Sequence, residues 1–359
     1  MAELDDLPLR DDLRGLSPYG APQKHVRIPL NVNENSHGIP EPVARDVVTA
    51  LAGAVLQANR YPDREFTALR EGLADYLGHG LTRDNTWAAN GSNEILQQVL
   101  QAFGGPGRSV LGFPPTYSMY PILARGTGTT WVAGKRDADY AITPETAVRE
   151  IVATEPDLVF FCSPNNPTGT PLALDTIEAA YDAARGIVVV DEAYAEFAPP
   201  DTPSALTLLP GRERLIVSRT MSKAFAFAGV RLGYLAADPA VADALRLVRL
   251  PYHLSALTQA AAVAALGHAD ELLATVADIA AQRDRMLAEL PRLGFPTRES
   301  WTNFVLFGGV ADPAALFDAL LERDILIRDV GIPNHLRVTA GTEVETSAFL
   351  AAMAELAAQ

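Results

Sequence analysis

Residues 157–169, DLVFFCSPNNPTG, join a continuous run of apolar, β-branched and aromatic residues to a dense cluster of turn formers. The same theme returns in IVVVD at 187–191, and the segment between them, 172–184, has the apolar spacing of a helix. Strands that are apolar on both faces and separated by helices are typical of a mainly parallel sheet covered by helices. The stretch therefore predicts an α/β fold.

Short apolar runs on either side of this stretch extend the pattern. Four more predicted strands are SVLGF (109–113), TTWVA (129–133), RLIVS (214–218) and LGYLAA (232–237). Helical spacing is found at 116–124 and 144–155, and upstream from Pro40 to Leu56 and from Arg64 to Leu77. The sheet should therefore contain at least six strands.

The pattern changes after about Leu245, where a long alanine-rich helical stretch, 255–293, begins. Short strands are expected at 304–308, 325–328 and 336–340, with helices at 313–323 and 343–357. This organisation predicts an N-terminal arm at 1–27, a large α/β domain at 28–245 and a smaller α+β C-terminal domain at 246–359.

Composition and charge argue against several classes of protein. The 44 acidic and 29 basic residues give a net charge of −15, which repels nucleic-acid phosphates. Cys162 is the only cysteine, so neither an intrachain disulfide nor a cysteine-based zinc site is expected, and the six histidines show no i, i+4 pairing for a metal. No apolar run approaches the about 20 residues that span a bilayer, and the acidic start lacks the layout of a signal peptide. We expect a cytoplasmic protein with no metal, nucleic-acid or membrane partner.

Lys223 is the first candidate for a chemical role. It is one of three lysines and is followed by the apolar run AFAFAG. An apolar setting lowers the pKa of an amine and makes it a better nucleophile for a Schiff base. The alternative is a surface lysine whose stem lies along apolar neighbours, which is the more frequent situation for a single lysine.

Other polar groups should gather near Lys223, because ligands of open parallel sheets bind at the carboxyl ends of the strands. Asp191 ends the most apolar strand, where a carboxylate needs a cationic partner such as a protonated pyridine nitrogen; a helix N-cap is the alternative. Gly91-Ser92-Asn93 precedes a helical run and is suited to holding a phosphate, and Arg231 could pair with the same phosphate or form a structural ion pair.

Several motifs together resemble one family, and they occur in its order over nearly the whole chain. The motifs are LNVNEN (30–35), RYPD (60–63), GSNEIL (91–96), PTYSMY (115–120), SPNNPTG (163–169), DEAYAEF (191–197), SKAFAFAGVRLGY (222–234), NFVLF (303–307), ILIRD (325–329) and LRVTAGT (336–342). This set resembles the fold-type I aminotransferases that depend on pyridoxal 5'-phosphate, and among them the histidinol-phosphate aminotransferases. Motifs for nucleotide, zinc-protease or serine-hydrolase sites are absent from the sequence.

The resemblance implies a role for each residue around the cofactor. Lys223 would carry it as a Schiff base and move the proton, with Asp191 on the ring nitrogen and Tyr194 as the third catalytic residue. The other implied cofactor contacts are Asn166 and Tyr194 at the phenolic oxygen, Tyr117 on the ring face, and Ser92, Asn93, Thr220, Ser222 and Arg231 around the phosphate. Tyr61 would reach that phosphate from a neighbouring subunit, which implies a homodimer with shared active sites.

The resemblance also implies the substrates. Arg337 and Arg328 would hold the phosphate of L-histidinol phosphate, and then the α-carboxylate of glutamate in the other half-reaction. Tyr19, Tyr252 and Asn93 would enclose the imidazole. The implied reaction interconverts L-histidinol phosphate and 2-oxoglutarate with imidazole acetol phosphate and L-glutamate, in histidine biosynthesis. Ser36 and His253 depart from the residues that are usual in the family, near the expected substrate pocket.

Three alternatives use the same residues differently. An aromatic amino-acid aminotransferase on this fold would use the two arginines for a carboxylate. A decarboxylase acting on threonine phosphate would keep the cofactor and release carbon dioxide. A binding protein that kept the fold without the chemistry would have no need of Lys223, Asp191 and Tyr194.

Overall fold

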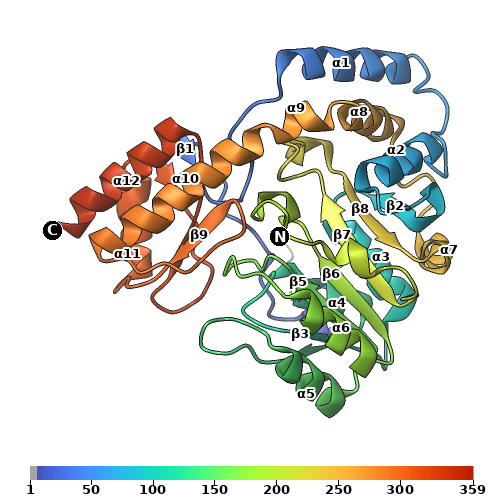
Figure 1. Cartoon of the computed structure of the whole chain (residues 1–359), viewed down its shortest axis with the longest axis horizontal. Helices are drawn as coiled ribbons and strands as arrows, with labels where there is room; N and C mark the ends of the chain where they lie inside the picture. The colour runs from blue at the N-terminus through green and yellow to red at the C-terminus, as the bar shows by residue number, and fades with distance from the viewer. Residues whose placement is uncertain (1–5, 359) are drawn as a thin grey trace.

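A computed structural model describes residues 6–358 of the chain (Figure 1). Its centre is a seven-stranded sheet in the order β2-β8-β7-β6-β5-β3-β4. The strands are β2 (Thr86–Ala89), β3 (Ser109–Gly112), β4 (Thr130–Ala133), β5 (Leu158–Cys162), β6 (Ile187–Asp191), β7 (Leu215–Thr220) and β8 (Gly233–Ala237). Only β8 runs antiparallel to its neighbours, so the predicted α/β fold with a mainly parallel sheet is confirmed.

Helices surround this sheet and bury it. They are α1 (Glu41–Val55), α2 (Thr67–Leu77), α3 (Ser92–Phe103), α4 (Met119–Thr127), α5 (Pro144–Thr154), α6 (Leu174–Ala183) and α7 (Pro239–Val248). Every residue of β5 and β6 is buried, which explains why these strands are apolar throughout instead of alternating. Two apolar strands with both faces covered form the centre of the larger hydrophobic core.

A smaller group of elements forms a second core, at the orange and red end of the chain in Figure 1. The short strand β1 (Ile28–Pro29) pairs in parallel with β10 (Ile325–Leu326), and β9 (Phe304–Phe307) pairs antiparallel with β11 (Leu336–Thr339). The helices here are α10 (Thr275–Glu289), α11 (Pro313–Leu321) and α12 (Glu343–Ala357). The chain therefore enters through this smaller part before it forms the large sheet.

The two cores do not divide where the sequence pattern changes. The alanine-rich stretch 255–293 is not one helix but α8 (Ala256–Leu266), α9 (Ala269–Leu273) and α10, with a bend of 82° after α8. Ala261 and Ala265 of α8 are buried in the larger core, whereas β1 contributes Ile28 to the smaller one. The domain boundary expected at 245/246 therefore differs from the division between the two cores. Small alanine side chains give little periodic signal, so the sequence does not show which core each helix packs against.

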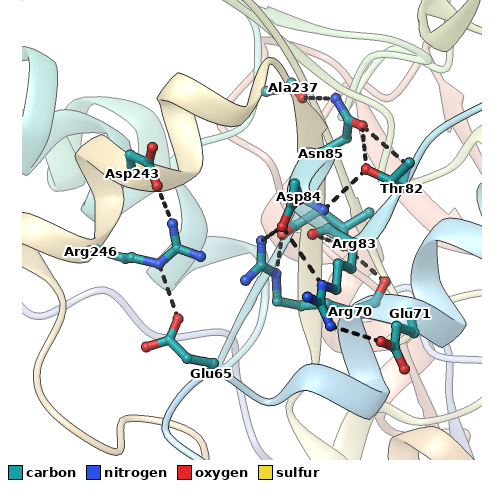
Figure 2. A network of polar contacts seen from close by, with 11 residues as sticks. Glu65, Arg70, Glu71, Thr82, Arg83, Asp84, Asn85, Ala237, Asp243 and Arg246 are labelled. Carbon is teal, nitrogen blue, oxygen red and sulfur yellow. Dashed lines mark hydrogen bonds and ion pairs between the residues drawn. The ribbon is translucent and has the colours of Figure 1, made fainter.

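Polar contacts fasten the β2 edge of the sheet to the helices outside it (Figure 2). Arg70 of α2 donates to the carbonyl of Thr86 at 2.8 Å, and the side chain of Asn85 donates to the carbonyl of Ala237 at 3.1 Å. Glu65, just before α2, accepts from Arg246 of α7 at 3.0 Å. These contacts join the start of β2 and the end of β8 to two helices. Within residues 6–358 no single helix is long and apolar enough to cross a membrane, although the bent pair Ala256–Leu266 and Ala269–Leu293 passes that test jointly.

Candidate active site

A cavity of about 280 Å³ lies where the two parts of the chain meet at the carboxyl ends of β5, β6 and β7. Thirteen of the fifteen residues selected from the sequence line it. They are Tyr19, Ser92, Asn93, Tyr117, Asn166, Asp191, Tyr194, Thr220, Ser222, Lys223, Arg231, Arg328 and Arg337. The arm, the start of α3, four loops of the large sheet and the smaller core thus contribute to one cavity.

Lys223 lies three residues beyond the end of β7 and points its amine into this cavity. Its Nζ donates to the carbonyl oxygen of Val32 at 2.9 Å. Burial, together with the nearby charges of Arg337 and Arg231, lowers the pKa of Lys223 to about 8, against the opposite effect of Glu34. The amine is therefore much closer to a neutral, nucleophilic state at physiological pH than an exposed lysine.

Asp191 is the last residue of β6, and only 2% of its surface is exposed. Its Oδ2 accepts from the hydroxyl of Tyr120 at 2.9 Å, and its Oδ1 accepts from the hydroxyl of Ser218 at 3.2 Å. Burial raises the pKa of Asp191 to about 6, although both hydrogen bonds lower it. No Lys, Arg or His of residues 6–358 forms an ion pair with this carboxylate within 4.0 Å, so a ligand cation would supply a missing partner.

The start of α3 forms an anion-binding end of the cavity. No side chain caps this helix, whose N-cap is Gly91 with φ of +85°. A Cβ at Gly91 would lie 2.4 Å from Nη2 of Arg231, and a Cβ at Gly233 would lie 2.2 Å from the backbone nitrogen of Ser92. The two glycines therefore let a guanidinium and a strand approach the helix terminus, where backbone N–H groups attract anions.

Hydroxyl groups complete this end. The Oγ1 of Thr220 donates to the Oγ of Ser222 at 3.0 Å, and Nη1 of Arg231 donates to the same Oγ at 3.3 Å. Arg231 also donates to the carbonyl of Ala228 at 3.1 Å, which holds the guanidinium beside the hydroxyls. One cation, two hydroxyls and a helix start are thus arranged around a single point, as a phosphate group requires.

Tyrosine and asparagine side chains line the middle of the cavity. The hydroxyl of Tyr194 accepts from Nδ2 of Asn33 at 2.9 Å and from Nδ2 of Asn166 at 3.4 Å. The hydroxyl of Tyr117 donates to Oδ1 of Asn93 at 3.1 Å. Burial raises the pKa of both tyrosines, so their phenols remain protonated donors.

Arg337 on β11 and Arg328 form the cationic wall opposite the large sheet. Nη1 of Arg337 donates to Oδ1 of Asn166 at 2.6 Å and Nη2 to the carbonyl of Asn31 at 2.8 Å, while its buried Nε has no hydrogen-bond partner among the described residues. Burial lowers the pKa of Arg337 to about 10. Arg328 pairs with Arg337 through backbone hydrogen bonds of 3.0 and 2.9 Å and lies 5.8 Å from the ring of Tyr19. Nε is thus a buried donor that the described chain leaves unsatisfied.

Tyr61 and Tyr252 are the two selected residues that do not line the cavity. Their rings stack on each other with centroids 4.4 Å apart, and 79% of Tyr61 and 39% of Tyr252 are exposed. His253 also lies outside the cavity, with Nε2 2.9 Å from the carbonyl of Ala88 and its ring over Trp87. The described chain therefore places the tyrosine pair on its surface.

Sequence reasoning missed a second set of residues around the site. Backbone carbonyls of Asn31 and Val32 accept from Arg337 and Lys223, and the side chain of Asn33 donates to Tyr194. These three residues belong to the LNVNEN motif, so the signal was present but carried no role. Tyr120, which contacts Asp191, lies in the PTYSMY motif three residues after Tyr117, and its helical spacing indicated only packing.

Comparisons with known proteins agree with this geometry. The family model described as aminotransferase class I and II matches residues 26–353. The histidinol-phosphate aminotransferase of Paenarthrobacter aurescens is 64% identical over 359 residues, which cover 99% of this chain and 96% of that protein. That of Thermobifida fusca is 59% identical over 354 residues, with 98% and 95% covered.

The fold comparison leads to the same group. The crystal structure of histidinol-phosphate aminotransferase from Sinorhizobium meliloti, in complex with pyridoxal-5'-phosphate, matches with a TM-score of 0.87, 26% identity and 98% of each chain covered. With a family model over most of the chain and full-length relatives above half identity, the chain belongs to the class I and II aminotransferases and, within them, to the histidinol-phosphate aminotransferase family.

Proposed function

We propose that this chain is a pyridoxal-phosphate-dependent transaminase that interconverts L-histidinol phosphate and 2-oxoglutarate with imidazole acetol phosphate and L-glutamate, in histidine biosynthesis. The observation that carries the proposal is that one cavity contains three complementary features. A lysine amine of lowered pKa, a buried carboxylate without a cation, and an anion-binding helix start surround it. These match the aldehyde, the ring nitrogen and the phosphate of the cofactor.

The cavity fits this cofactor for reasons found in the chain itself. A Cβ at Gly91 would collide with Arg231, so the chain keeps open the space in which a guanidinium reaches a phosphate at the uncapped start of α3. Asp191 is buried without a cationic partner among the described residues, which suits a protonated ring nitrogen. We propose that Ser92, Asn93, Thr220, Ser222 and Arg231 hold the phosphate, while Lys223 bonds the cofactor's carbonyl carbon.

Each residue around the proposed cofactor then has a definite role. When bound, pyridoxal phosphate supplies a ring that withdraws electrons from the bonds of the substrate carbon carrying the amino group. Asp191 would pair with the ring nitrogen and keep it protonated, and the hydroxyl of Tyr194 with the amide of Asn166 would hold the phenolic oxygen. Tyr117 would lie against the ring. Lys223, with a pKa near physiological pH, takes a proton at Nζ from one carbon and returns it to another.

Arg337 and Arg328 support a substrate with a compact anion. Histidinol phosphate has a phosphate but no carboxylate, whereas glutamate has carboxylates, and a planar guanidinium binds either anion through paired hydrogen bonds. Nε of Arg337 is the unpartnered donor that such an anion would satisfy. Tyr19, which lies beside Arg328, would help enclose the imidazole. The relatives above 50% identity carry this substrate in their names, which supports the phosphate over an aromatic amino acid.

We further propose a homodimer in which Tyr61 serves the cavity of the other copy. Tyr61 lies on the surface, stacked on Tyr252, and therefore cannot contribute to the cavity of its own chain in this arrangement. Large apolar side chains are exposed at the C-terminal ends of α1 and α7, including Leu56 at 85%, Leu247 at 86% and Leu250 at 75%. Exposed apolar residues of this size are typical of a surface that another subunit covers.

A spectral titration tests the substrate. The holoenzyme is mixed under anaerobic conditions with L-histidinol phosphate, or in parallel with L-phenylalanine, and the loss of the cofactor's visible band is followed. Histidinol phosphate is expected to convert the cofactor at a far lower concentration. Conversion by phenylalanine at the lower concentration would mean that the arginines bind a carboxylate. Carbon dioxide release from threonine phosphate in a third, parallel sample, without a keto product, would indicate a decarboxylase.

Hybrid dimers test the shared site. Chains with Lys223→Ala are refolded or co-expressed with chains carrying Tyr61→Ala, each inactive or weak alone. If Tyr61 acts in the other copy, the hybrid regains one intact site, and random pairing should restore about a quarter of wild-type activity. Activity no higher than that of the two parents would place Tyr61 in its own chain's site or outside the chemistry.

A further inference from the structure

Tyr120 is a buried tyrosine that does not line the cavity but whose hydroxyl contacts the carboxylate of Asp191. It lies in the first turn of α4, has no exposed surface, and its ring packs edge-on against Phe160 of β5 and Tyr117, with centroids 5.4 and 5.5 Å away. This packing leaves the ring little freedom to rotate away. The hydroxyl therefore stays 2.9 Å from Oδ2 of Asp191.

Two neutral hydroxyls and the backbone N–H of Ala193, and no cation of the described chain, stabilise the charge of Asp191. Ser218 is paired with Asp191 in the register of β6 and β7, and its hydroxyl contacts Oδ1 at 3.2 Å. Tyr120 approaches Oδ2 from α4, which is a different element on the other side of the carboxyl group. A carboxylate accepting two such bonds has a fixed orientation, and each bond to its charged form favours ionisation.

The other titratable groups around Asp191 do not take over this role. Cys162 is its neighbour on β5, and burial raises the pKa of that thiol to about 12, so it remains neutral. Glu192, the next residue, is already paired with Arg219 at 2.8 Å. Burial beside Asp191 raises the pKa of Tyr120 well above its usual value, so the phenol remains a donor.

We propose that Tyr120 is a positioning residue that keeps Asp191 ionised and aimed into the cavity, and so sets how tightly, and down to what pH, the cofactor's ring nitrogen is held. The proposal rests on the proposed cofactor site. It assigns to the second tyrosine of PTYSMY a role distinct from that of Tyr117, which lines the cavity itself. Tyr120 touches neither cofactor nor substrate and acts only through Asp191.

The test compares cofactor affinity across pH in Tyr120→Phe and wild-type protein. The dissociation constant of pyridoxal phosphate is measured on cofactor-free protein by equilibrium dialysis at several pH values between about 6 and about 8.5. Without the phenol the pKa of Asp191 rises, so the carboxylate protonates earlier as the pH falls. The variant is expected to bind about tenfold more weakly at the acid end and to approach wild-type affinity at the alkaline end.

Two further variants make the result specific. Ser218→Ala removes the longer hydrogen bond and should shift the pH profile in the same direction by a smaller amount. Tyr181→Phe removes a phenol from a buried tyrosine of α6, away from the cavity, and should bind like the wild type at every pH. Thermal denaturation of each protein reports whether it is folded, and if Tyr120→Phe does not fold, Tyr120→Leu, which also removes the hydroxyl, is measured in its place.

The outcomes separate this inference from the proposed function. Wild-type protein that binds no pyridoxal phosphate would overturn the cofactor site itself. Wild-type binding together with an unchanged pH profile in folded Tyr120→Phe would overturn only the role of Tyr120. A loss of affinity that is equal at every pH would also overturn it, because a purely structural defect has no reason to follow the ionisation of Asp191.

Discussion

Replacing Arg337 by lysine is expected to weaken both half-reactions by a similar factor, because one guanidinium would hold the anion of each substrate. Arginine has five N–H donors, of which one is used by Asn166 and one by the carbonyl of Asn31. Three donors remain, including Nε, which has no hydrogen-bond partner among the described residues, and we expect the anion of the substrate to use them. Lysine has three donors on one atom and cannot satisfy both neighbours and form a paired contact with an anion.

The size of the effect follows from this count. The variant loses about two charge-assisted hydrogen bonds to the anion, each contributing about 1.5 kcal/mol, or about 3 kcal/mol in all. A loss of that size lowers kcat/KM by roughly 150-fold. Single-turnover rates are measured separately with L-histidinol phosphate and with L-glutamate, so that each half-reaction reports its own change.

A matched control is Arg298→Lys, because Arg298 pairs with the exposed Asp139 outside the cavity. This variant should stay within about twofold of the wild type, since surface ion pairs contribute little. A fall confined to one substrate in Arg337→Lys would refute the shared anion site. A fall of less than about threefold for both would refute the energetic count.

Three further variants report on the amine, the phosphate end and the core. In cofactor-free protein, Lys223→Met should have a higher free energy of unfolding than wild type below about pH 8, and this difference should shrink as the pH rises towards 10.5. The reason is that between these pH values the folded wild-type protein binds fewer protons at Lys223 than the unfolded chain does. Urea denaturation at several pH values measures the difference. Gly91→Ala should weaken pyridoxal phosphate binding about tenfold in equilibrium dialysis, since a Cβ displaces Arg231. Leu96→Ala empties part of the core at a residue with no exposed surface and should lower the free energy of unfolding by about 3 kcal/mol in urea denaturation.

Each of these has a control and an opposing outcome. Gly53→Ala lies in α1 with nothing near its added Cβ and should leave cofactor binding unchanged, so equal losses at both glycines would contradict the role of the phosphate end. Val344→Ala removes a side chain that is 78% exposed and should change stability by less than about 0.5 kcal/mol. A stability difference between wild type and Lys223→Met that is the same at every pH would contradict a lowered pKa of Lys223.

Strong local patterns made most of the fold predictable. The strand predicted at 187–191 and the helix predicted at 343–357 have those bounds in the structure, because the first is continuously apolar and the second begins at a capping box formed by Thr342 and Glu345. The strand β2, TWAA, escaped detection because two of its four residues are alanines, which are depleted in strands, and four residues are too few to show a period. The division of the long alanine-rich stretch escaped for the same reason.

The candidate site was predictable where chemistry selects a residue type, and less so where packing does. Lys223 and Asp191 stand out because a charge beside apolar residues is costly and so needs an explanation. Tyr120 does not stand out, since a buried tyrosine at helical spacing is ordinary until its hydroxyl is found beside Asp191. The carbonyls of Asn31 and Val32 leave no trace in the sequence, because every residue has one.

The single antiparallel strand, β8, places Lys223 and Arg231 in the same connection between strands. After most parallel strands the chain passes the cavity edge once and continues into a helix. Because β8 is antiparallel to β7, the connection from Met221 to Leu232 lies at that edge over its whole length. Lys223 and Arg231 therefore belong to one hairpin and move as a unit. An insertion within it would displace the amine from the phosphate-binding start of α3, and would therefore disturb both of these groups at once.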